Sequence, residues 1–196
     1  GVEHRGVCRQ DFDITDAAAT QDYIAEYCPD AVIHCSAWTA VDRAEKEPEK
    51  CRAVNVDGTR NIAAVCQEIG AKMLYISTDY VFSGAGERFY EPEDPTGPLG
   101  VYGETKRNGE LAVRELLERF FIVRISWVFG KNGKNFVRTM LGLAETRAEV
   151  NVVCDQIGSP TYTADLAPLL CDMIATDQYG VYHATNEGVC SWAEFA

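Results

Sequence analysis

The chain contains eight cysteines but no Cys-x-x-Cys pair. They stand at Cys8, Cys28, Cys35, Cys51, Cys66, Cys154, Cys171 and Cys190. Most lie in apolar runs, where cysteine behaves as a small hydrophobic residue. Their spacing does not match that of a zinc site, so we expect no metal site. Free thiols are typical of a reducing compartment, and we expect a cytoplasmic protein.

Positive charge is also scarce. Lys and Arg total 18 against 30 Asp and Glu, which gives a formal net charge of −12. Such a chain repels the phosphate backbone, so we do not expect a nucleic acid as its partner. The sequence shows no apolar run long enough for a transmembrane helix and no secretory signal, so we expect no membrane partner either. Its 46% of hydrophobic residues is ample for one domain with a small lobe.

Both ends of the chain lack features of a complete protein. It starts at Gly1 rather than Met, directly in a segment at 2–8 that we interpret as a strand. It stops after Ser191–Ala196, which resembles the first turn of a helix. We therefore expect a fragment of a longer chain.

Strand and helix patterns alternate along the chain. We predict strands at 2–8, 31–35, 72–78, 120–125, 150–153 and 180–184, and helices at 17–27, 49–69, 102–119, 136–145 and 162–174. Asn55 is a poor helix former inside the second helix, and its side chain would bind the backbone of a neighbouring element. The alternation over 2–128 predicts an α/β fold, with a parallel sheet and helices on both of its faces. The shorter elements that follow predict a small lobe over the carboxyl edge of the sheet.

Tyr102 and Lys106 stand four residues apart at the start of the helix predicted at 102–119. Residues at this spacing share one helix face, so the phenol and the ammonium would point into the same space. A nearby cation lowers the pKa of a tyrosine, which suits that tyrosine to act as a general acid. The alternative is that Tyr102 packs the helix and Lys106 is solvated, because Tyr-x-x-x-Lys alone is a common pattern.

The strand at 72–78 ends on two hydroxyl side chains, Ser77 and Thr78. Open α/β sheets bind their ligands outside the carboxyl ends of the strands. A strand-end threonine followed by a helix-borne Tyr-x-x-x-Lys is rarer than either pattern alone. The combination predicts a catalytic site formed by Thr78, Tyr102 and Lys106.

Five segments taken together resemble the dTDP-4-dehydrorhamnose reductase family of the extended short-chain dehydrogenase/reductase superfamily. They are PDAVIHCSAWTAVDRAE at 29–45, STDYVF at 77–82, YGETK at 102–106, RISWVFG at 124–130 and DQIGSPT at 155–161. The resemblance covers nearly the whole chain, and its specificity lies in the combination. It implies a Rossmann-type, doubly wound NAD(P)-binding domain at 1–130 and a substrate-binding lobe at 131–196, both partial and with elements that interleave.

The resemblance also implies an activity, which is reduction of the 4-keto group of dTDP-4-dehydro-6-deoxy-L-mannose to dTDP-L-rhamnose for cell-surface polysaccharide synthesis. Tyr102 would protonate the sugar oxygen as hydride arrives, and Lys106 would lower the Tyr102 pKa and hold the nicotinamide ribose. Thr78 would hydrogen-bond the carbonyl being reduced. The implied cofactor-binding residues are Asp13, Ile14, Ser36, Ala37, Tyr102 and Lys106. The implied substrate-binding residues are Thr39, Val41, Thr78, Tyr80 and Trp127.

Tyr80 separates a reductase from its relatives. Sugar dehydratases of the superfamily carry the motif Thr-Asp-Glu at this strand end, because eliminating water needs an extra acid and base. The third residue here is Tyr80, so that pair is missing, and Thr78 with Tyr102 suffices to reduce a ketone. We therefore expect a reductase rather than a dehydratase or an epimerase.

The chain departs from the family at two places. The Gly-rich phosphate turn that precedes the strand near Val2 in the family is absent, so we expect this chain to bind the cofactor weakly and the full-length protein to bind it well. His34-Cys35-Ser36 replaces the usual Asn-Ala-Ala. NADPH is expected over NADH, because Arg9 follows the strand whose end meets the adenosine ribose and suits a 2′-phosphate. A surface role for Arg9, and with it NADH, remains the alternative.

Assembly and turnover are open at this stage. Some relatives dimerise with Mg²⁺, and the sequence shows no ligand set that would establish Mg²⁺ binding or a homodimer here. One alternative function is that of another sugar-nucleotide reductase or epimerase of the superfamily. The other is a non-catalytic regulatory subunit resembling that of methionine adenosyltransferase. The intact Thr78, Tyr102 and Lys106 favour catalysis.

Overall fold

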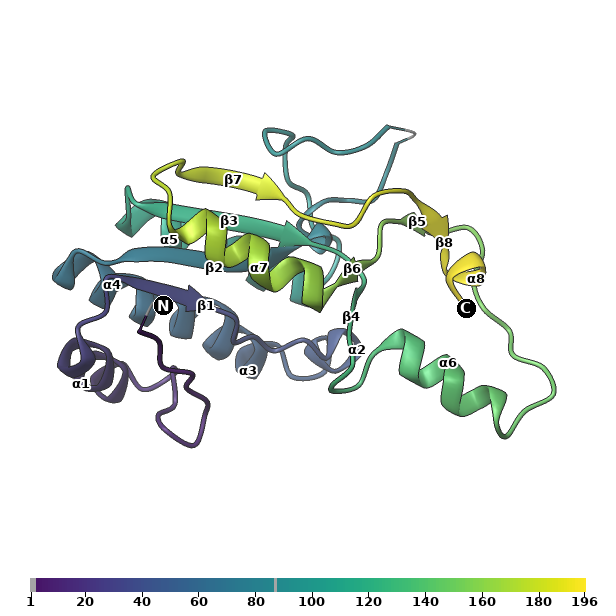
Figure 1. Ribbon diagram of the computed structural model, residues 1–196, viewed down its shortest axis with the longest axis horizontal. Coiled ribbons are helices and arrows are strands. Elements are labelled where there is room, and N and C mark those ends of the chain that lie inside the picture. Colours follow the sequence, from purple (N-terminus) through teal and green to yellow (C-terminus); the bar gives the residue numbers. More distant parts are fainter. Residues whose placement is uncertain (1–2, 87) are drawn as a thin grey trace.

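Four strands form one parallel sheet at the centre of the computed structural model, which describes residues 3–86 and 88–196. The strands are β1 (Ala31–His34), β2 (Lys72–Thr78), β3 (Phe120–Ile125) and β7 (Gly180–His183), and they lie in the order β1-β2-β3-β7 (Figure 1). In the register of the sheet, Leu74 lies opposite Ile33 on one side and Phe121 on the other. All three pairings are parallel, so the carboxyl ends of the strands meet at one edge.

Helices cover both faces of this sheet. On one face lie α1 (Ala17–Tyr27), α4 (Gly58–Ile69) and α5 (Val101–Leu116), and on the other lies α7 (Thr163–Ile174) (Figure 1). Successive side chains of a strand point to opposite faces, which divides the core in two. Met73 and Tyr75 pack on the α1, α4 and α5 side, whereas Leu74 packs with Leu166 and Leu170 of α7. The predicted doubly wound α/β fold is confirmed.

Shorter elements complete the structure. They are α2 (Val41–Ala44), α3 (Pro48–Arg52), the π-helix η1 (Ala53–Asp57), the 3₁₀ turn η2 (Asp79–Val81), β4 (Val128–Phe129), α6 (Phe136–Ala144), β5 (Ile157–Gly158), β6 (Thr161–Tyr162), β8 (Cys190–Ser191) and α8 (Trp192–Phe195). The short strands form two small sheets. In one, β4 pairs with β6 in parallel orientation, and in the other, β5 pairs with β8 in antiparallel orientation. Within residues 3–86 and 88–196, no helix combines the length and the apolar character needed to cross a membrane.

Local signals set several helix ends. The Asp16 carboxylate accepts from the Ala19 backbone N–H and caps α1, as expected for a short acidic side chain at this position. Gly70 adopts a left-handed conformation and ends α4. The helix predicted at 49–69 is divided into α3, η1 and α4, because the backbone widens into a π-helix around Asn55.

Three strand predictions need correction. Residues 3–8 form no strand, while Gly1 and Val2 lie outside the described residues. No strand forms at 150–153 either, because no other strand pairs with this segment, and Val153 is half exposed although its carbonyl accepts from the Ala193 N–H. The strand expected in the C-terminal lobe, β7, instead pairs with β3 in the main sheet. The division of the chain into domains at residue 130 remains a prediction.

Candidate active site

Thr78 ends β2 at the carboxyl edge of the sheet. Its side chain is buried, and its Oγ1 donates to Asp79 Oδ1 at 2.9 Å while accepting from the Tyr80 backbone N–H at 3.3 Å. These contacts begin the turn η2 and leave Tyr80 half exposed. The hydroxyl predicted to face a sugar carbonyl is therefore held at the strand end by its two neighbours.

Tyr102 lies in the first turn of α5, and its ring forms an edge-to-face pair with the Tyr80 ring at 5.5 Å between ring centres. The close approach of α5 to η2 requires glycine at position 103. A Cβ on Gly103 would lie 2.2 Å from the Tyr80 carbonyl oxygen. The structure thus brings together Thr78, Tyr80 and Tyr102, which the sequence placed in one site.

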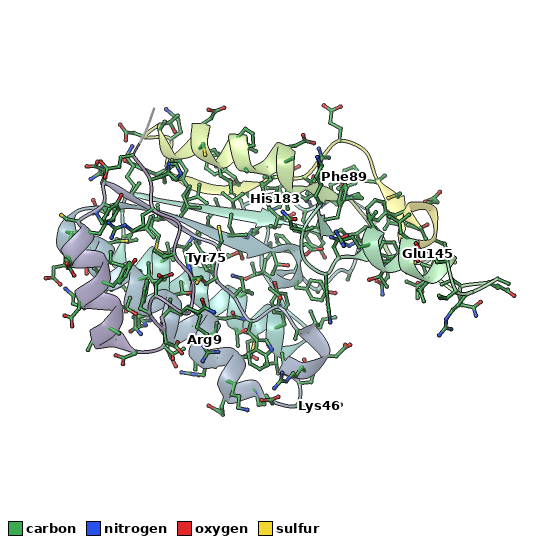
Figure 2. All side chains as sticks on the ribbon, turned by 60° about the horizontal axis from the view of Figure 1, so that its bottom comes forward. Arg9, Lys46, Tyr75, Phe89, Glu145 and His183 are labelled. Atoms are coloured by element: carbon green, nitrogen blue, oxygen red, sulfur yellow. The ribbon has the colours of Figure 1, made fainter. Side chains whose placement is uncertain are left out.

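Lys106 points into the protein. Its side chain is buried, its Nζ donates to the Ile76 carbonyl at 2.7 Å, and the ammonium lies 4.0 Å from the centre of the Tyr75 ring. Tyr75 itself is fully buried and lies in the middle of the molecule (Figure 2). The alternative of a solvated Lys106 is therefore wrong.

Burial controls both pKa values at the site. It raises the pKa of Tyr102 to about 12, with the Thr78 hydroxyl acting in the opposite direction. Burial also lowers the pKa of Lys106 to about 7, and Glu110 opposes this shift. Because burial outweighs the opposing effects, the Tyr102 pKa moves opposite to the sequence expectation. The Lys106 ammonium is directed at the Ile76 carbonyl and the Tyr75 ring.

Asn55 ties the segment after β1 to α5. Its Oδ1 accepts from the Trp38 backbone N–H at 2.8 Å, and its Nδ2 donates to the Trp38 carbonyl at 3.2 Å. The same Nδ2 reaches Thr105 Oγ1 at 3.1 Å, and that hydroxyl donates to the Tyr102 carbonyl at 2.9 Å. The expected role of Asn55 in binding a neighbouring backbone is confirmed.

The predicted residues after β1 lie at the same edge of the sheet as Thr78. Ser36 and Thr39 are exposed, Ala37 is partly buried, and Val41 is the first residue of α2. Because β1 and β2 are neighbours, their carboxyl ends adjoin. Trp127 follows β3, but its ring stacks on Trp192 at 3.6 Å between ring centres. The structure shows no ring contact between Trp127 and either Tyr80 or Tyr102.

Asp13 and Ile14 lie in the turn before α1. Asp13 Oδ1 accepts from the Thr15 backbone and hydroxyl, which lowers the Asp13 pKa, and its Oδ2 pairs with Arg9 at 2.9 Å. Ile14 packs against Gly58 of α4. The Arg9 guanidinium, expected near a ribose phosphate, is exposed and held by Asp13.

Sequence reasoning missed two acidic residues beside this site. Asp79 is the group to which Thr78 donates, and burial raises its pKa. Glu110 lies one turn after Lys106 on α5 and forms a buried ion pair with Arg124 of β3. The spacing of four residues between Lys106 and Glu110 was the available signal for the second.

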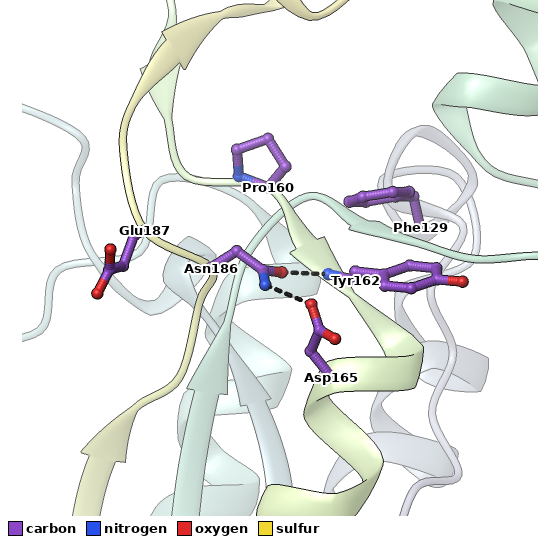
Figure 3. Close-up of a pocket in the computed structure, with 6 residues that line it drawn as sticks. All are labelled: Phe129, Pro160, Tyr162, Asp165, Asn186 and Glu187. Atoms are coloured by element: carbon purple, nitrogen blue, oxygen red, sulfur yellow. Dashed lines mark hydrogen bonds between the residues drawn. The ribbon is translucent and has the colours of Figure 1, made fainter.

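A separate cavity of ≈ 300 Å³ lies where β6 meets α7 (Figure 3). Its lining residues are Phe129, Pro160, Tyr162, Asp165, Asn186 and Glu187. The Asn186 amide accepts from the Tyr162 backbone and donates to Asp165 Oδ2, each at 2.7 Å, so both of its ends are engaged. None of the predicted site residues lines this cavity. Across the described residues, no group of three or more His, Cys, Asp or Glu side chains has an arrangement suited to a metal ion.

Comparison with known proteins adds a family and close relatives. The family model described as RmlD substrate binding domain matches residues 1–196. The chain is 48% identical to a dTDP-4-dehydrorhamnose reductase of Streptomyces griseus, covering 96% of this chain and 64% of that protein. It is 38% identical to a dTDP-4-keto-6-deoxy-D-glucose reductase of Streptomyces niveus, covering 97% and 66%.

The fold agrees with that of a solved reductase structure. The crystal structure of dTDP-4-dehydrorhamnose reductase from Bacillus anthracis in complex with NADP superposes with a TM-score of 0.94. The two sequences are 47% identical, over 95% of this chain and 66% of the other. The chain thus spans about two thirds of the length of these relatives.

Proposed function

Since the chain belongs to the RmlD substrate binding domain family, we propose that the full-length protein is a dTDP-4-dehydrorhamnose reductase that uses NADPH. The observation that carries this proposal is the meeting of Thr78, Tyr80 and Tyr102 at the carboxyl end of β2, with Lys106 buried one turn further along α5. The reductases of S. griseus and B. anthracis support the same activity.

Tyr102 acts as the proton donor in this proposal. With a pKa of about 12, its phenol stays protonated near neutral pH and can give the proton to a sugar oxygen as negative charge develops there. Thr78 turns its hydroxyl from Asp79 toward the same oxygen, where a donor gains strength as the alkoxide forms. Five residues bind the sugar in this proposal, namely Thr39, Val41, Thr78, Tyr80 and Trp127.

The chain offers residues that fit a dinucleotide at the edge of the sheet. Ser36 and Ala37 are small residues at the carboxyl end of β1, where a flat ligand can approach the backbone. When bound, NADPH supplies the hydride. Lys106 holds the nicotinamide ribose, and Asp13 and Ile14 flank the adenine. Arg9 favours NADPH, and NADH is the alternative cofactor.

The remaining features of the proposal concern the whole protein. Residues 1–130 bind the cofactor, and residues 131–196 contribute the substrate lobe, with α7 and β7 built into the cofactor domain. Eight free cysteines support a cytoplasmic location. Because some relatives dimerise, a homodimer is the assembly to test in the full-length protein.

A second substrate is favoured by one relative. The S. niveus reductase, named for dTDP-4-keto-6-deoxy-D-glucose, is 38% identical to this chain. Both sugars present a 4-keto group to the same proton donor, and they differ in configuration elsewhere on the ring. The two substrates are therefore compared in one assay.

The assay follows the absorbance of reduced cofactor in the full-length protein. Each 4-keto sugar nucleotide is mixed with NADPH and with NADH, for the wild type, Tyr102→Phe and the control Tyr23→Phe. Tyr23 lies on α1, where its ring stacks on Phe12 at 4.7 Å. We expect NADPH oxidation with dTDP-4-dehydro-6-deoxy-L-mannose that Tyr102→Phe abolishes and Tyr23→Phe retains.

Other results would overturn parts of the proposal. No oxidation with either cofactor rejects the reductase and favours the epimerase and regulatory-subunit alternatives. Faster oxidation with the D-glucose derivative changes the substrate. Turnover that survives in Tyr102→Phe keeps the reaction but removes Tyr102 as the donor.

A further inference from the structure

Glu110 forms a buried ion pair that joins three elements. Arg124 of β3 donates from Nε to Glu110 Oε1 at 2.9 Å and from Nη2 to Oε2 at 2.7 Å. Ser77 of β2 donates to the same Oε1 at 2.6 Å. Both charged side chains are buried, so each depends on the other for its stability in the interior.

The same pair reaches the segment between η2 and α5. Arg124 Nη1 donates to the Pro92 carbonyl at 3.0 Å, and the guanidinium lies 4.9 Å from the centre of the Phe82 ring. Phe82 in turn stacks on Tyr90 at 4.2 Å. Through Arg124, the carboxylate of Glu110 therefore connects this segment to the helix that carries Tyr102.

The balance of charge in this part of the core is uneven. Lys106 and Arg124 are two buried cations, and Glu110 is the carboxylate one helical turn from Lys106. A cation removed from water is costly unless an opposite charge or dipoles surround it. The Ile76 carbonyl and the Tyr75 ring supply dipoles to Lys106, whereas Glu110 supplies negative charge.

We propose that Glu110 is a positioning residue for the Tyr102–Lys106 site. Its carboxylate stabilises the Lys106 ammonium inside the protein, and it fixes α5 against β3 through Arg124. The proposal rests on the proposed reductase function. Burial lowers the pKa of Lys106, and Glu110 acts against that effect. The groups around Lys106 are His34 and Cys35 at the end of β1, Tyr75 and the Ile76 carbonyl of β2, Cys51 of α3 and Glu110 of α5. Tyr102 lies one turn before Lys106 on α5.

A structural role and an electrostatic role of Glu110 predict different pH dependences of activity. If Glu110 only fastened α5 to β3, its loss would lower activity equally at every pH. If it also keeps Lys106 protonated, its loss moves the Lys106 pKa further down. The loss of activity in the variant is then small below pH 7 and large above it, where Lys106 loses its proton.

The experiment compares Glu110→Gln, Glu110→Asp and Glu104→Gln in the full-length protein. Gln keeps the shape of Glu110 but has neither its charge nor its second acceptor oxygen, so one of the acceptors used by Arg124 and Ser77 is lost. Asp keeps the charge, and Glu104 is an exposed carboxylate on the same helix. The first readout is the titration of Lys106 by NMR of protein labelled at lysine Cε, with the signal assigned from Lys106→Arg. The second is kcat/KM from pH 6 to pH 9. The titration does not require turnover, so its result stands even if the reductase assay fails.

We expect Glu110→Gln to move the Lys106 midpoint to lower pH and to reduce kcat/KM at pH 8 about tenfold more than at pH 6. Glu110→Asp and Glu104→Gln should keep the wild-type midpoint. An unchanged midpoint in Glu110→Gln, or a loss that is equal at both pH values, would overturn the proposal. If Glu110→Gln does not fold, the double variant Glu110→Gln with Arg124→Met is compared with Arg124→Met alone. Its Lys106 midpoint must lie below that of the single variant, because the two proteins differ only at residue 110.

Discussion

Replacing Gly103 by alanine tests how the first turn of α5 is placed. A Cβ at this position would lie 2.2 Å from the Tyr80 carbonyl oxygen and 3.0 Å from Pro98 Cβ. The first of these atoms is backbone, so the clash cannot be relieved by turning a side chain. Either α5 or the turn at Tyr80 must shift, and Tyr102 shifts with it.

The expected cost follows from two opposing effects on the free energy of unfolding. Overpacking a close contact costs about 1–3 kcal/mol, and a backbone clash of this depth lies at the upper end. Alanine inside a helix returns about 1 kcal/mol relative to glycine. We therefore expect Gly103→Ala to lower the free energy of unfolding by about 1–2 kcal/mol, or the melting temperature by about 2–8 °C.

Gly142→Ala is the matched control, because Gly142 also lies inside a helix, α6, but has open space around its Cβ position. This variant keeps the helix gain without a clash, so it should stabilise the protein by about 1 kcal/mol. Urea unfolding followed by tryptophan fluorescence measures both variants. Equal or greater stability of Gly103→Ala relative to wild type would refute the proposed contact between α5 and η2.

Two further perturbations address the buried polar groups. Asn55→Ala leaves the Trp38 backbone N–H and carbonyl without their partner, so urea unfolding should show a loss of about 2–3 kcal/mol, and a loss well below 1 kcal/mol would contradict this. Burial lowers the pKa of His34 from 6.5 to about 3, so the unfolded chain binds the proton more tightly than the folded one. Stability from neutral His34 is thus complete above pH 6.5 and is lost as the pH falls toward 3. Between these pH values, the free energy of unfolding should vary less with pH in His34→Gln than in the wild type. An equal pH dependence in the two proteins would argue against this burial effect.

Much of the fold could be predicted from local pattern. The strands at 31–34, 72–78 and 120–125 are apolar runs, and such runs identify strands of a parallel sheet. Those at 72–78 and 120–125 are buried on both faces, whereas Ile33 in the edge strand is exposed. The segment at 150–153 contains three valines, yet a strand exists only where a partner strand is available, and here no strand pairs with it. The membership of β7 in the main sheet likewise depends on a pairing with β3 that sequence spacing does not encode.

The residue types of the candidate site follow from the sequence, whereas the orientations of their side chains do not. Spacing placed Tyr102 and Lys106 on one face of α5, and both lie there. The direction of the Lys106 ammonium depends on the Ile76 carbonyl and the Tyr75 ring, which belong to another element. The Glu110–Arg124 pair was missed for the same reason, because its members are separated in sequence and meet only when α5 packs on β3.

We propose that the full-length protein delivers a hydride from NADPH to a 4-keto sugar nucleotide at the carboxyl edge of the sheet, beside β1 and β2. The most direct test uses NADPH that carries deuterium at both C4 positions of the nicotinamide, with dTDP-4-dehydro-6-deoxy-L-mannose and the full-length protein. We predict one deuterium at C4 of the sugar in the product, found by mass spectrometry and NMR, and none when Tyr102→Phe replaces the wild type. Recovery of unlabelled or unreduced sugar nucleotide with the wild-type protein would contradict the account.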